Sequence, residues 1–177
     1  MRIISGTHKG RRLTAPKSLP VRPTTDFAKE ALFNILRNQY ELTQLSVLDL
    51  FAGTGNISFE FASRGVPTIR AVDAHYECVK YINKVAEEFQ FPIETVKADV
   101  FKYVGTSHAA SDIIFADPPY EFDTERLTEL TGNIFQNNLL APDGILIIEH
   151  AKQTDLSLIP RFQEARKYGS SVFSFFE

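Results

Sequence analysis

The chain has 177 residues, 44% hydrophobic and 23% charged, with a net charge of −3 and a single cysteine, Cys78. These values suit one soluble globular domain, exclude an intrachain disulfide and leave no run of about 18 apolar residues that could cross a membrane. The four histidines lack metal-ligand spacing and the start lacks the apolar middle of a signal peptide, so we predict a cytoplasmic protein without a metal.

The first 22 residues differ from the rest of the chain in charge. Every charged side chain among them is basic, namely Arg2, Lys9, Arg11, Arg12, Lys17 and Arg22, so the remainder is clearly acidic. Such asymmetry is typical of an arm that contacts a polyanion, although a solvated segment without a partner would have the same composition. We therefore separate a basic N-terminal extension, residues 1–22, from a main domain, residues 23–177.

After the extension, hydrophobic spacing predicts helices and short apolar strands in alternation. Helices are expected at 27–40, 57–65, 75–91 and from near Asp123 to residue 140, with Thr24 or Thr25 capping the first; strands are expected at 46–52, 68–74, 93–99, 111–117 and 144–150. Two more strands, joined near Gly169, are expected at 162–176. The alternation predicts a Rossmann-like α/β fold: a mostly parallel seven-stranded sheet, covered on both faces, with an antiparallel strand at the C-terminus.

The first predicted strand ends in the sequence DLFAGTGN, residues 49–56. In open α/β sheets ligands bind beyond the carboxyl ends of the strands, and glycines let the backbone approach them closely. A dinucleotide fingerprint would have a third glycine where this chain has Ser58, and the acid Asp49 would repel a pyrophosphate. The turn therefore favours a cationic cofactor such as S-adenosylmethionine over NAD. The candidate cofactor contacts here are Asp49, Phe51, Ala52, Gly53, Gly55 and Asn56.

Two further acids end the second and third predicted strands. Asp73, followed by Ala74, could accept hydrogen bonds from both ribose hydroxyls. Asp99, followed by Val100, could accept one from an adenine amino group. Each acid taken alone could simply cap a helix or a turn, but three at successive strand ends beside a glycine turn favour a cofactor site.

The fourth predicted strand ends at Asp117, Pro118, Pro119 and Tyr120, which are the catalytic candidates. An exocyclic amine is a poor nucleophile because its lone pair is delocalised into the ring. Asp117 and the Pro118 carbonyl could accept its two N–H groups and free that lone pair for attack on a methyl group. The prolines keep the corner rigid and without donors, and Tyr120 could stack on the base. Asp117 is also a candidate cofactor contact because it faces the same crevice as the glycine turn. Taken alone, however, the motif could be a plain turn that ends a strand.

Five segments, in order, resemble the RsmD family. They are RIISGTHKGRRL, VRPTTDFAKEALFNIL, VLDLFAGTGNISFEFASRG, FADPPY and LLAPDGILIIEH, and the second is the most specific because generic methyltransferases lack it. The resemblance implies a monomeric enzyme that uses S-adenosylmethionine to methylate the exocyclic N2 of one guanine in small-subunit ribosomal RNA, in an assembled or partly assembled subunit. It also implies that Thr24 and Thr25 lie near the methionine end of the cofactor. The implied RNA contacts are Arg2, Lys9, Arg11, Arg12 and Arg22.

The chain departs from the usual pattern of this family at three positions. Lys29 replaces an arginine, which keeps the charge and loses a fork-shaped contact. Asp73 replaces a glutamate and shortens the reach by one methylene, and His75 replaces a frequent aspartate. Glu149 and His150 end the fifth predicted strand, and no chemistry is assigned to them.

Other functions share part of these features. The proline corner also fits methyltransferases that act on adenine N6 in DNA or RNA, or on protein glutamine. DNA enzymes usually add a large target-recognition region, and glutamine enzymes typically have Asn at the position of Asp117. The intact glycine turn, strand-end acids and proline corner argue against a non-catalytic RNA-binding assembly factor, and the missing third glycine argues against an NAD-linked oxidoreductase.

Overall fold

The computed structural model describes residues 1–16, 19 and 24–177, so Arg22, Lys17 and the predicted boundary between residues 22 and 23 lie outside the described residues. The helices are α1 (Asp26–Gln39), α2 (Asn56–Ser63), α3 (Tyr76–Phe89), α4 (Val100–Thr106) and α5 (Thr124–Gln136), with a short 3-10 helix η1 (Leu42–Gln44). The strands are β1 (Ser46–Leu50), β2 (Thr68–Asp73), β3 (Ile93–Lys97), β4 (Ser111–Ala116), β5 (Leu140–Ala151), β6 (Phe162–Tyr168) and β7 (Ser171–Phe176). No helix in the described part of the chain is long and apolar enough to cross a membrane.

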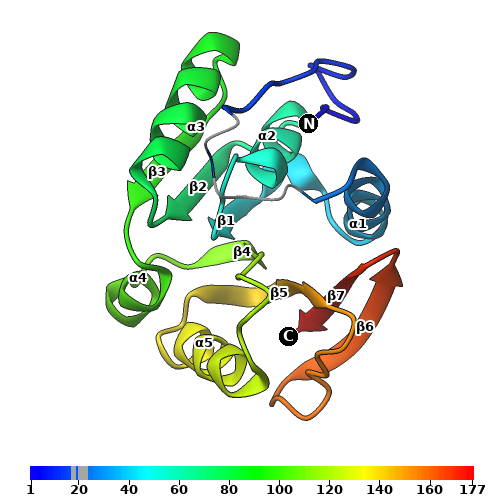
Figure 1. Cartoon of the computed structure of the whole chain (residues 1–177), viewed down its shortest axis with the longest axis vertical. Coiled ribbons are helices and arrows are strands. Elements are labelled where there is room, and N and C mark those ends of the chain that lie inside the picture. Colours follow the sequence, from blue (N-terminus) through cyan, green and yellow to red (C-terminus); the bar gives the residue numbers. More distant parts are fainter. Residues whose placement is uncertain (17–18, 20–23) are drawn as a thin grey trace.

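The strands form one sheet in the order β3-β2-β1-β4-β5-β7-β6 (Figure 1). β1 to β5 pair in parallel, and β7 pairs antiparallel with both β5 and β6. The strand order reverses between β1 and β4, which makes that point the switch point of the sheet. The predicted fold class is confirmed, including the antiparallel C-terminal strand.

Each face of the sheet has its own apolar core. α1, α2 and α3 pack against one face, which includes Val47 and Ile113, and α4 and α5 pack against the other, which includes Leu48 and Ile114 (Figure 1). Because successive residues of a strand point to opposite faces, a strand covered on both sides must be apolar at almost every position. This is why the central strands are unbroken apolar runs in the sequence rather than alternating ones.

Two elements differ from the prediction. The sequence does not predict α4, since its seven residues are too few to show helical periodicity; the Asp99 side chain caps it by accepting from the Lys102 amide at 3.0 Å. β5 begins at Leu140 and not at residue 144, so it includes Pro142 and Asp143, which resemble a turn in sequence. The register of β4 against β5 shifts at this point, which allows the strand to continue through an irregular stretch.

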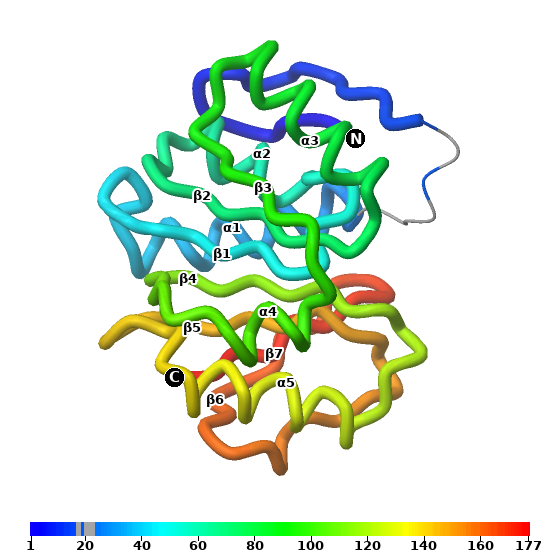
Figure 2. The backbone as a smooth tube through the Cα atoms, turned by 90° about the vertical axis from the view of Figure 1, so that its left-hand side faces the viewer, coloured from blue at the N-terminus to red at the C-terminus, as the bar shows by residue number. Residues whose placement is uncertain are grey.

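The N-terminal residues pack against α2 and α3 (Figure 2). Ile3 and Leu13 are buried in the same apolar core as α1, α2 and α3. The Thr7 amide donates to the Ser63 carbonyl at the end of α2, at 2.7 Å. Exposed basic side chains remain on this segment at Arg2, Lys9, Arg11 and Arg12. It is thus anchored by apolar burial while its charges face solvent, and its division from the main domain stays a prediction.

Candidate functional site

A cavity of about 600 Å³ opens at the carboxyl ends of β1, β2 and β4, at the switch point of the sheet. All the catalytic and cofactor candidates from the sequence line it, except Gly55. Thr24, which the family resemblance also places near the cofactor, lines it too. The residues that the prediction did not assign to the site but that also line it are Thr54, Ile57, His75, Phe115, Glu121, Phe122, Glu149, Ser170 and Ser171. The tertiary structure therefore brings together residues from both halves of the chain.

The glycine turn after β1 is held to the end of β2 by Asp73. One carboxylate oxygen of Asp73 accepts from the Gly53 amide at 2.7 Å, and the other accepts from the His75 amide at 2.8 Å. Each oxygen retains a second lone pair, so this acid can still accept hydrogen bonds from a ligand. Asp73 thus fixes the turn and faces the cavity at the same time.

Gly55 does not line the cavity, but it connects the glycine turn to α2. Its φ of +75° lies in the left-handed region, and it is the cap from which α2 begins. A Cβ atom added here would lie 2.9 Å from both Ile82 and Phe59 side chains. Glycine is therefore required both by backbone conformation and by close packing.

Phe51, in the same turn, is a bulky residue with a φ of +59°. Such a conformation costs on the order of 1–3 kcal/mol and is found mainly at functional sites. Its ring lies edge-on to that of Phe122, with the centroids 5.9 Å apart. In this strained conformation, Phe51 forms part of the cavity wall together with Phe122.

Asp49 is buried under the turn, with 1% of its surface exposed. The Ser58 hydroxyl donates to its carboxylate at 2.5 Å. Burial raises the pKa of Asp49 to about 7, although hydrogen bonds from Ser58 oppose the shift. Ser58 stands where a dinucleotide site would have its third glycine, and here its side chain stabilises the acid that such a site would exclude.

Asp117 and Glu149 are two further acids of the cavity wall, near the carboxyl ends of β4 and β5. Burial, followed by the charges of Glu149 and Asp49, raises the pKa of Asp117 well above its usual range. Burial also raises the pKa of Glu149, against hydrogen bonds from Ser171, Thr24 and Tyr120. Sequence reasoning assigned Glu149 no chemistry, yet it was marked by the same signal as the other acids, a carboxylate at the carboxyl end of a parallel strand.

Carboxylates dominate the charge of the cavity. Its acidic lining residues are Asp49, Asp73, Asp99, Asp117, Glu121 and Glu149, while the described lining includes no lysine or arginine. Such a cavity attracts a cationic group and repels phosphate. The exposed basic side chains of the N-terminal segment line no part of it, so the protein separates its two kinds of charge.

Thr25 and Asp99 each have a structural role as well as a place in the cavity wall. The Thr25 hydroxyl caps α1 by accepting from the Ala28 amide at 3.2 Å, and Asp99 caps α4. Helix capping is the alternative interpretation that the sequence leaves open for both residues. The two interpretations are compatible, because helices that begin at the carboxyl edge of the sheet have their caps at the cavity rim.

Lys29 is buried, with 1% of its surface exposed, and joins three parts of the fold. Its ammonium group donates to the Asn56 side chain at 2.8 Å and to the Arg2 carbonyl at 2.6 Å, and lies 3.4 Å from the Glu60 carboxylate. Burial lowers its pKa, while the charge of Glu60 opposes this. The Asn56 amide in turn donates to the Thr24 carbonyl at 3.0 Å. The lysine thereby links the N-terminal segment to the glycine turn.

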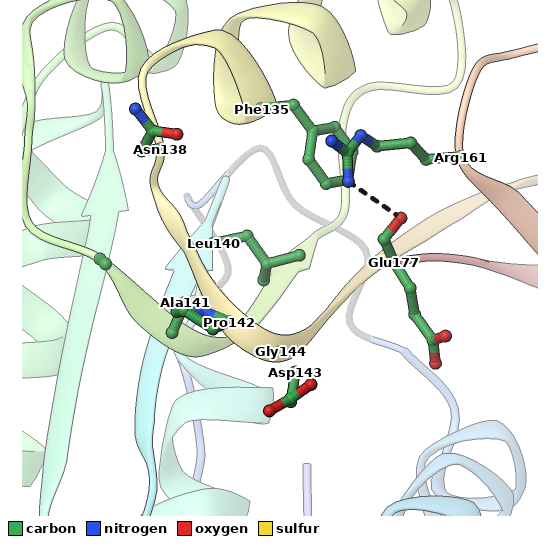
Figure 3. A pocket seen from close by; sticks show the side chains of 10 residues that line it. Phe135, Asn138, Leu140, Ala141, Pro142, Asp143, Gly144, Arg161 and Glu177 are labelled. Carbon is green, nitrogen blue, oxygen red and sulfur yellow. Dashed lines mark hydrogen bonds between the residues drawn. The ribbon is translucent and has the colours of Figure 1, made fainter.

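A second cavity, of about 760 Å³, lies at the other end of the strands, where β5 begins (Figure 3). Arg161 stacks on Phe135, 4.7 Å from the ring centroid, and donates to the Glu177 carbonyl at 3.4 Å. Neither cavity contains a cluster of histidine, cysteine and acidic residues that could hold a metal, as far as the described residues go.

Comparison with known proteins identifies the family. The model of the family described as conserved hypothetical protein 95 matches residues 1–177. A Bacillus subtilis protein named "Putative rRNA methyltransferase YlbH" is 32% identical over 164 residues, which are 88% of this chain and 85% of that protein. Ribosomal RNA small subunit methyltransferase D of Escherichia coli K12 is 28% identical over 162 residues, 90% of this chain and 79% of that protein.

A solved structure shares the fold over the whole chain. The structure of a hypothetical protein of Thermus thermophilus superposes with a TM-score of 0.86 at 27% identity, covering 100% of this chain and 99% of that chain. The resemblance seen in the sequence is confirmed by the family model and by the curated relatives. The chain belongs to the family described as conserved hypothetical protein 95, the RsmD family.

Proposed function

We propose that this protein transfers a methyl group from S-adenosylmethionine to the exocyclic N2 of a guanine in small-subunit ribosomal RNA. The observation that carries the proposal is the acid-lined cavity at the switch point of the sheet, with Asp117, Pro118, Pro119 and Tyr120 at its rim. The names of relatives such as the small-subunit methyltransferase D of Escherichia coli support the substrate.

The lining residues fit S-adenosylmethionine, which supplies an electrophilic methyl group on a positive sulfur. Asp49 and Asp117 give the negative potential that a sulfonium needs, and Asp73 offers acceptors for ribose hydroxyls. Val100 and Phe122 provide apolar wall for the adenine, next to Asp99. NAD would place a pyrophosphate against the same carboxylates, which is unfavourable.

The transfer requires the amine nitrogen to be held in line with the methyl group. Asp117 and the Pro118 carbonyl accept the two N–H groups, so the lone pair points at the carbon. A nitrogen–carbon bond forms as the sulfur–carbon bond breaks, and the nitrogen loses one proton to Asp117 or to water. A carboxylate with a raised pKa is a stronger base than a free aspartate, which suits Asp117 to that task.

The N-terminal segment supplies the RNA contacts. Lys9, Arg11 and Arg12 are exposed, whereas Arg2 forms an ion pair with Asp26 at 3.2 Å. Phosphate contacts of this kind position the RNA without choosing the base. The guanine has to leave its stack to reach the proline corner, where Tyr120, 44% exposed, can stack on it.

Methylation of small ribosomal subunits that lack the modification tests the proposal. With tritiated S-adenosylmethionine, we expect label in small-subunit RNA that maps to guanine N2. Label at adenine N6 would instead favour the alternative amine. Failure to bind S-adenosylmethionine in calorimetry would favour an assembly factor without turnover.

The charge of the N-terminal segment gives an independent test. Replacing Arg11 and Arg12 by glutamate should weaken RNA binding and reduce the slope of log affinity against log salt by about 1 per lost phosphate contact. Both the affinity and the slope can be measured by fluorescence anisotropy with a labelled RNA. An unchanged slope would remove these two residues from the RNA interface.

A further inference from the structure

Exposed aromatic rings gather around the acid-lined cavity. Among the described residues, the large apolar side chains that are exposed are Phe27, Tyr76, Tyr120 and Leu158. Tyr120 lines the cavity, and Tyr76 and Phe27 each lie within two residues of a lining residue. A single exposed ring is common on protein surfaces, but three around one cavity indicate a partner with flat apolar faces.

Phe27 is the most exposed of these three rings, with 66% of its surface exposed. α1 buries its neighbours Ala28 and Leu32 in the apolar core and leaves Phe27 outside. The Phe27 ring meets that of Tyr168 at an angle of 72°, with the centroids 6.1 Å apart. Tyr168 packs in turn on the buried ring of Phe173, with the centroids 6.0 Å apart. The Phe27 ring is therefore supported from the core on one side and open to solvent elsewhere.

The pair of Phe27 and Tyr168 lies next to the cavity wall on both of its elements. Phe27 follows the lining residue Thr25 by two positions, and Tyr168 precedes the lining residue Ser170 by two positions. α1 packs against β6, and Figure 1 shows the end of β6 beside α1. Two residues of a helix rise by only about 3 Å, so a nucleotide at Phe27 can be joined directly to one in the cavity.

The charges around Phe27 favour a base over a phosphate at this position. Glu30 is exposed three residues further along α1, on the same side of the helix. It would repel a phosphate beside Phe27, whereas a base is uncharged and stacks through its π face. Asp26, the preceding residue, is paired with Arg2 at 3.2 Å, which joins the first turn of α1 to the basic N-terminal segment. An RNA strand can thus run from that segment over Phe27 to the cavity.

We propose that Phe27 binds a nucleotide that adjoins the target guanine in single-stranded RNA, by stacking on its base. The inference rests on the proposed function and adds to it a base-binding position outside the cavity. The N-terminal segment holds phosphates, Phe27 holds a flanking base, and the proline corner holds the guanine. Because every base has a π face, this position sets the path of the strand and not the choice of base.

Binding to small ribosomal subunits that lack the modification tests the stacking site. Immobilised protein and biolayer interferometry give the affinity over a series of salt concentrations. Phe27→Ala should weaken binding about tenfold, as expected for the loss of one stacked base. The slope of log affinity against log salt should stay unchanged, because no phosphate contact is lost. This separates Phe27 from Arg11 and Arg12, whose replacement should reduce the slope.

Two further variants separate stacking from plain apolar contact. Phe27→Trp keeps a flat aromatic face and should bind within about twofold of the wild type. Phe27→Leu keeps an apolar side chain without a flat face, so it should lose nearly as much affinity as Phe27→Ala. If Phe27→Leu binds as tightly as the wild type, the contact is apolar, as with a protein surface of the subunit, and the inference is wrong.

Steady-state methylation of the same subunits gives a second readout. Phe27→Ala should raise KM for the subunits about tenfold and leave kcat and S-adenosylmethionine affinity within about twofold, because Phe27 does not line the cavity. Leu158→Ala is the matched control, since Leu158 is 94% exposed and lines neither cavity. It should change none of these quantities by more than about twofold. The midpoint of urea unfolding should be the same for both variants and the wild type, since both side chains are exposed.

The outcomes separate this inference from the proposed function. Unchanged affinity of Phe27→Ala, or a reduced salt slope, would overturn the stacking site. A wild-type protein that transfers no methyl group to the subunits would refute the proposed function itself. An active wild type together with an unaffected Phe27→Ala variant would refute only the role of Phe27.

Discussion

The two ends of the sheet carry cavities of similar size and very different chemistry. The cavity at the carboxyl ends, of about 600 Å³, has buried acids with raised pKa values, a strained aromatic and glycine turns. The cavity at the amino end of β5, of about 760 Å³, is the larger, but its polar contacts are a long hydrogen bond and a stacked arginine at the surface (Figure 3).

Volume therefore does not identify the site in this fold. Parallel strands that diverge at a switch point leave a crevice at their carboxyl ends, and the loops that follow them all open into it. Acids placed at successive carboxyl ends of the strands are thus brought together around one cavity. The concentration of buried like charges, which is costly unless a ligand offsets it, distinguishes the functional end.

Removal of one carboxylate from each cavity should give the largest difference in methyl transfer. Asp117→Ala should reduce methyl transfer at least about a hundredfold, because the target amine loses its acceptor, while S-adenosylmethionine binding should weaken by less than about tenfold, because Asp49 and Asp73 remain in the cavity wall. Glu177→Ala removes a carboxylate from the wall of the other cavity. It should leave methyl transfer and S-adenosylmethionine binding within about twofold of the wild type. Filter-binding assays and calorimetry provide the two measurements. Near-full activity of Asp117→Ala would contradict the proposed role of this carboxylate.

Strand-end acids can be compared in the same way. Asp73→Asn should weaken S-adenosylmethionine binding about 10- to 100-fold, because the carboxylate holds the glycine turn and faces the ligand. Asp112→Asn is the control at the amino end of β4, where the acid accepts from the Ser46 amide at 2.7 Å. This control should lower the free energy of unfolding without changing cofactor affinity, as calorimetry and urea titration can check. Equal affinity losses in both variants would mean that the effect is one of stability.

The packing of the glycine turn can be tested by a substitution that adds one methyl group. Gly55→Ala should lower the free energy of unfolding by about 2 kcal/mol, because its φ is +75° and the new Cβ would meet Ile82 and Phe59. Gly105→Ala, in α4 with open space around it, should instead raise stability by up to about 1 kcal/mol. Urea unfolding measures both, and equal effects would show that the turn is not strained.

The smallest expected effect is a pH dependence set by Asp49. Its pKa is raised to about 7 in the folded state, so its contribution to stability is present below about pH 4 and is lost as the pH rises through about 7. The charge that appears over that range should strengthen binding of S-adenosylmethionine by up to about tenfold between pH 6 and pH 8, and should not strengthen binding of the neutral S-adenosylhomocysteine. Asp49→Asn should abolish the difference. The same pH slope for both ligands in calorimetry would exclude a sulfonium contact at this acid.

Most of the site could be predicted because its residues follow parallel strands, whose ends are visible in sequence as apolar runs that stop at an acid. Glu149 ends such a run as well, but nothing local shows that Thr24, Ser171 and Tyr120 converge on it from three other segments. α4 is short, with a glycine in its last turn, so its periodicity is not visible. The buried Lys29 was recognised only as a departure from a pattern, because its partners are distant in sequence.

The sequence by itself determined three features: the acids and glycines that follow the predicted strands, the acid before the two prolines, and the family that these segments resemble. These are local properties, since a strand, a turn and a rigid corner each depend on a few adjacent residues. The tertiary structure alone decided which acids face one another, that Ser58 stabilises Asp49, and that Lys29 ties the N-terminal segment to the glycine turn. Burial and proximity of charges depend on contacts between distant segments, and those contacts set the pKa values on which the proposed chemistry depends.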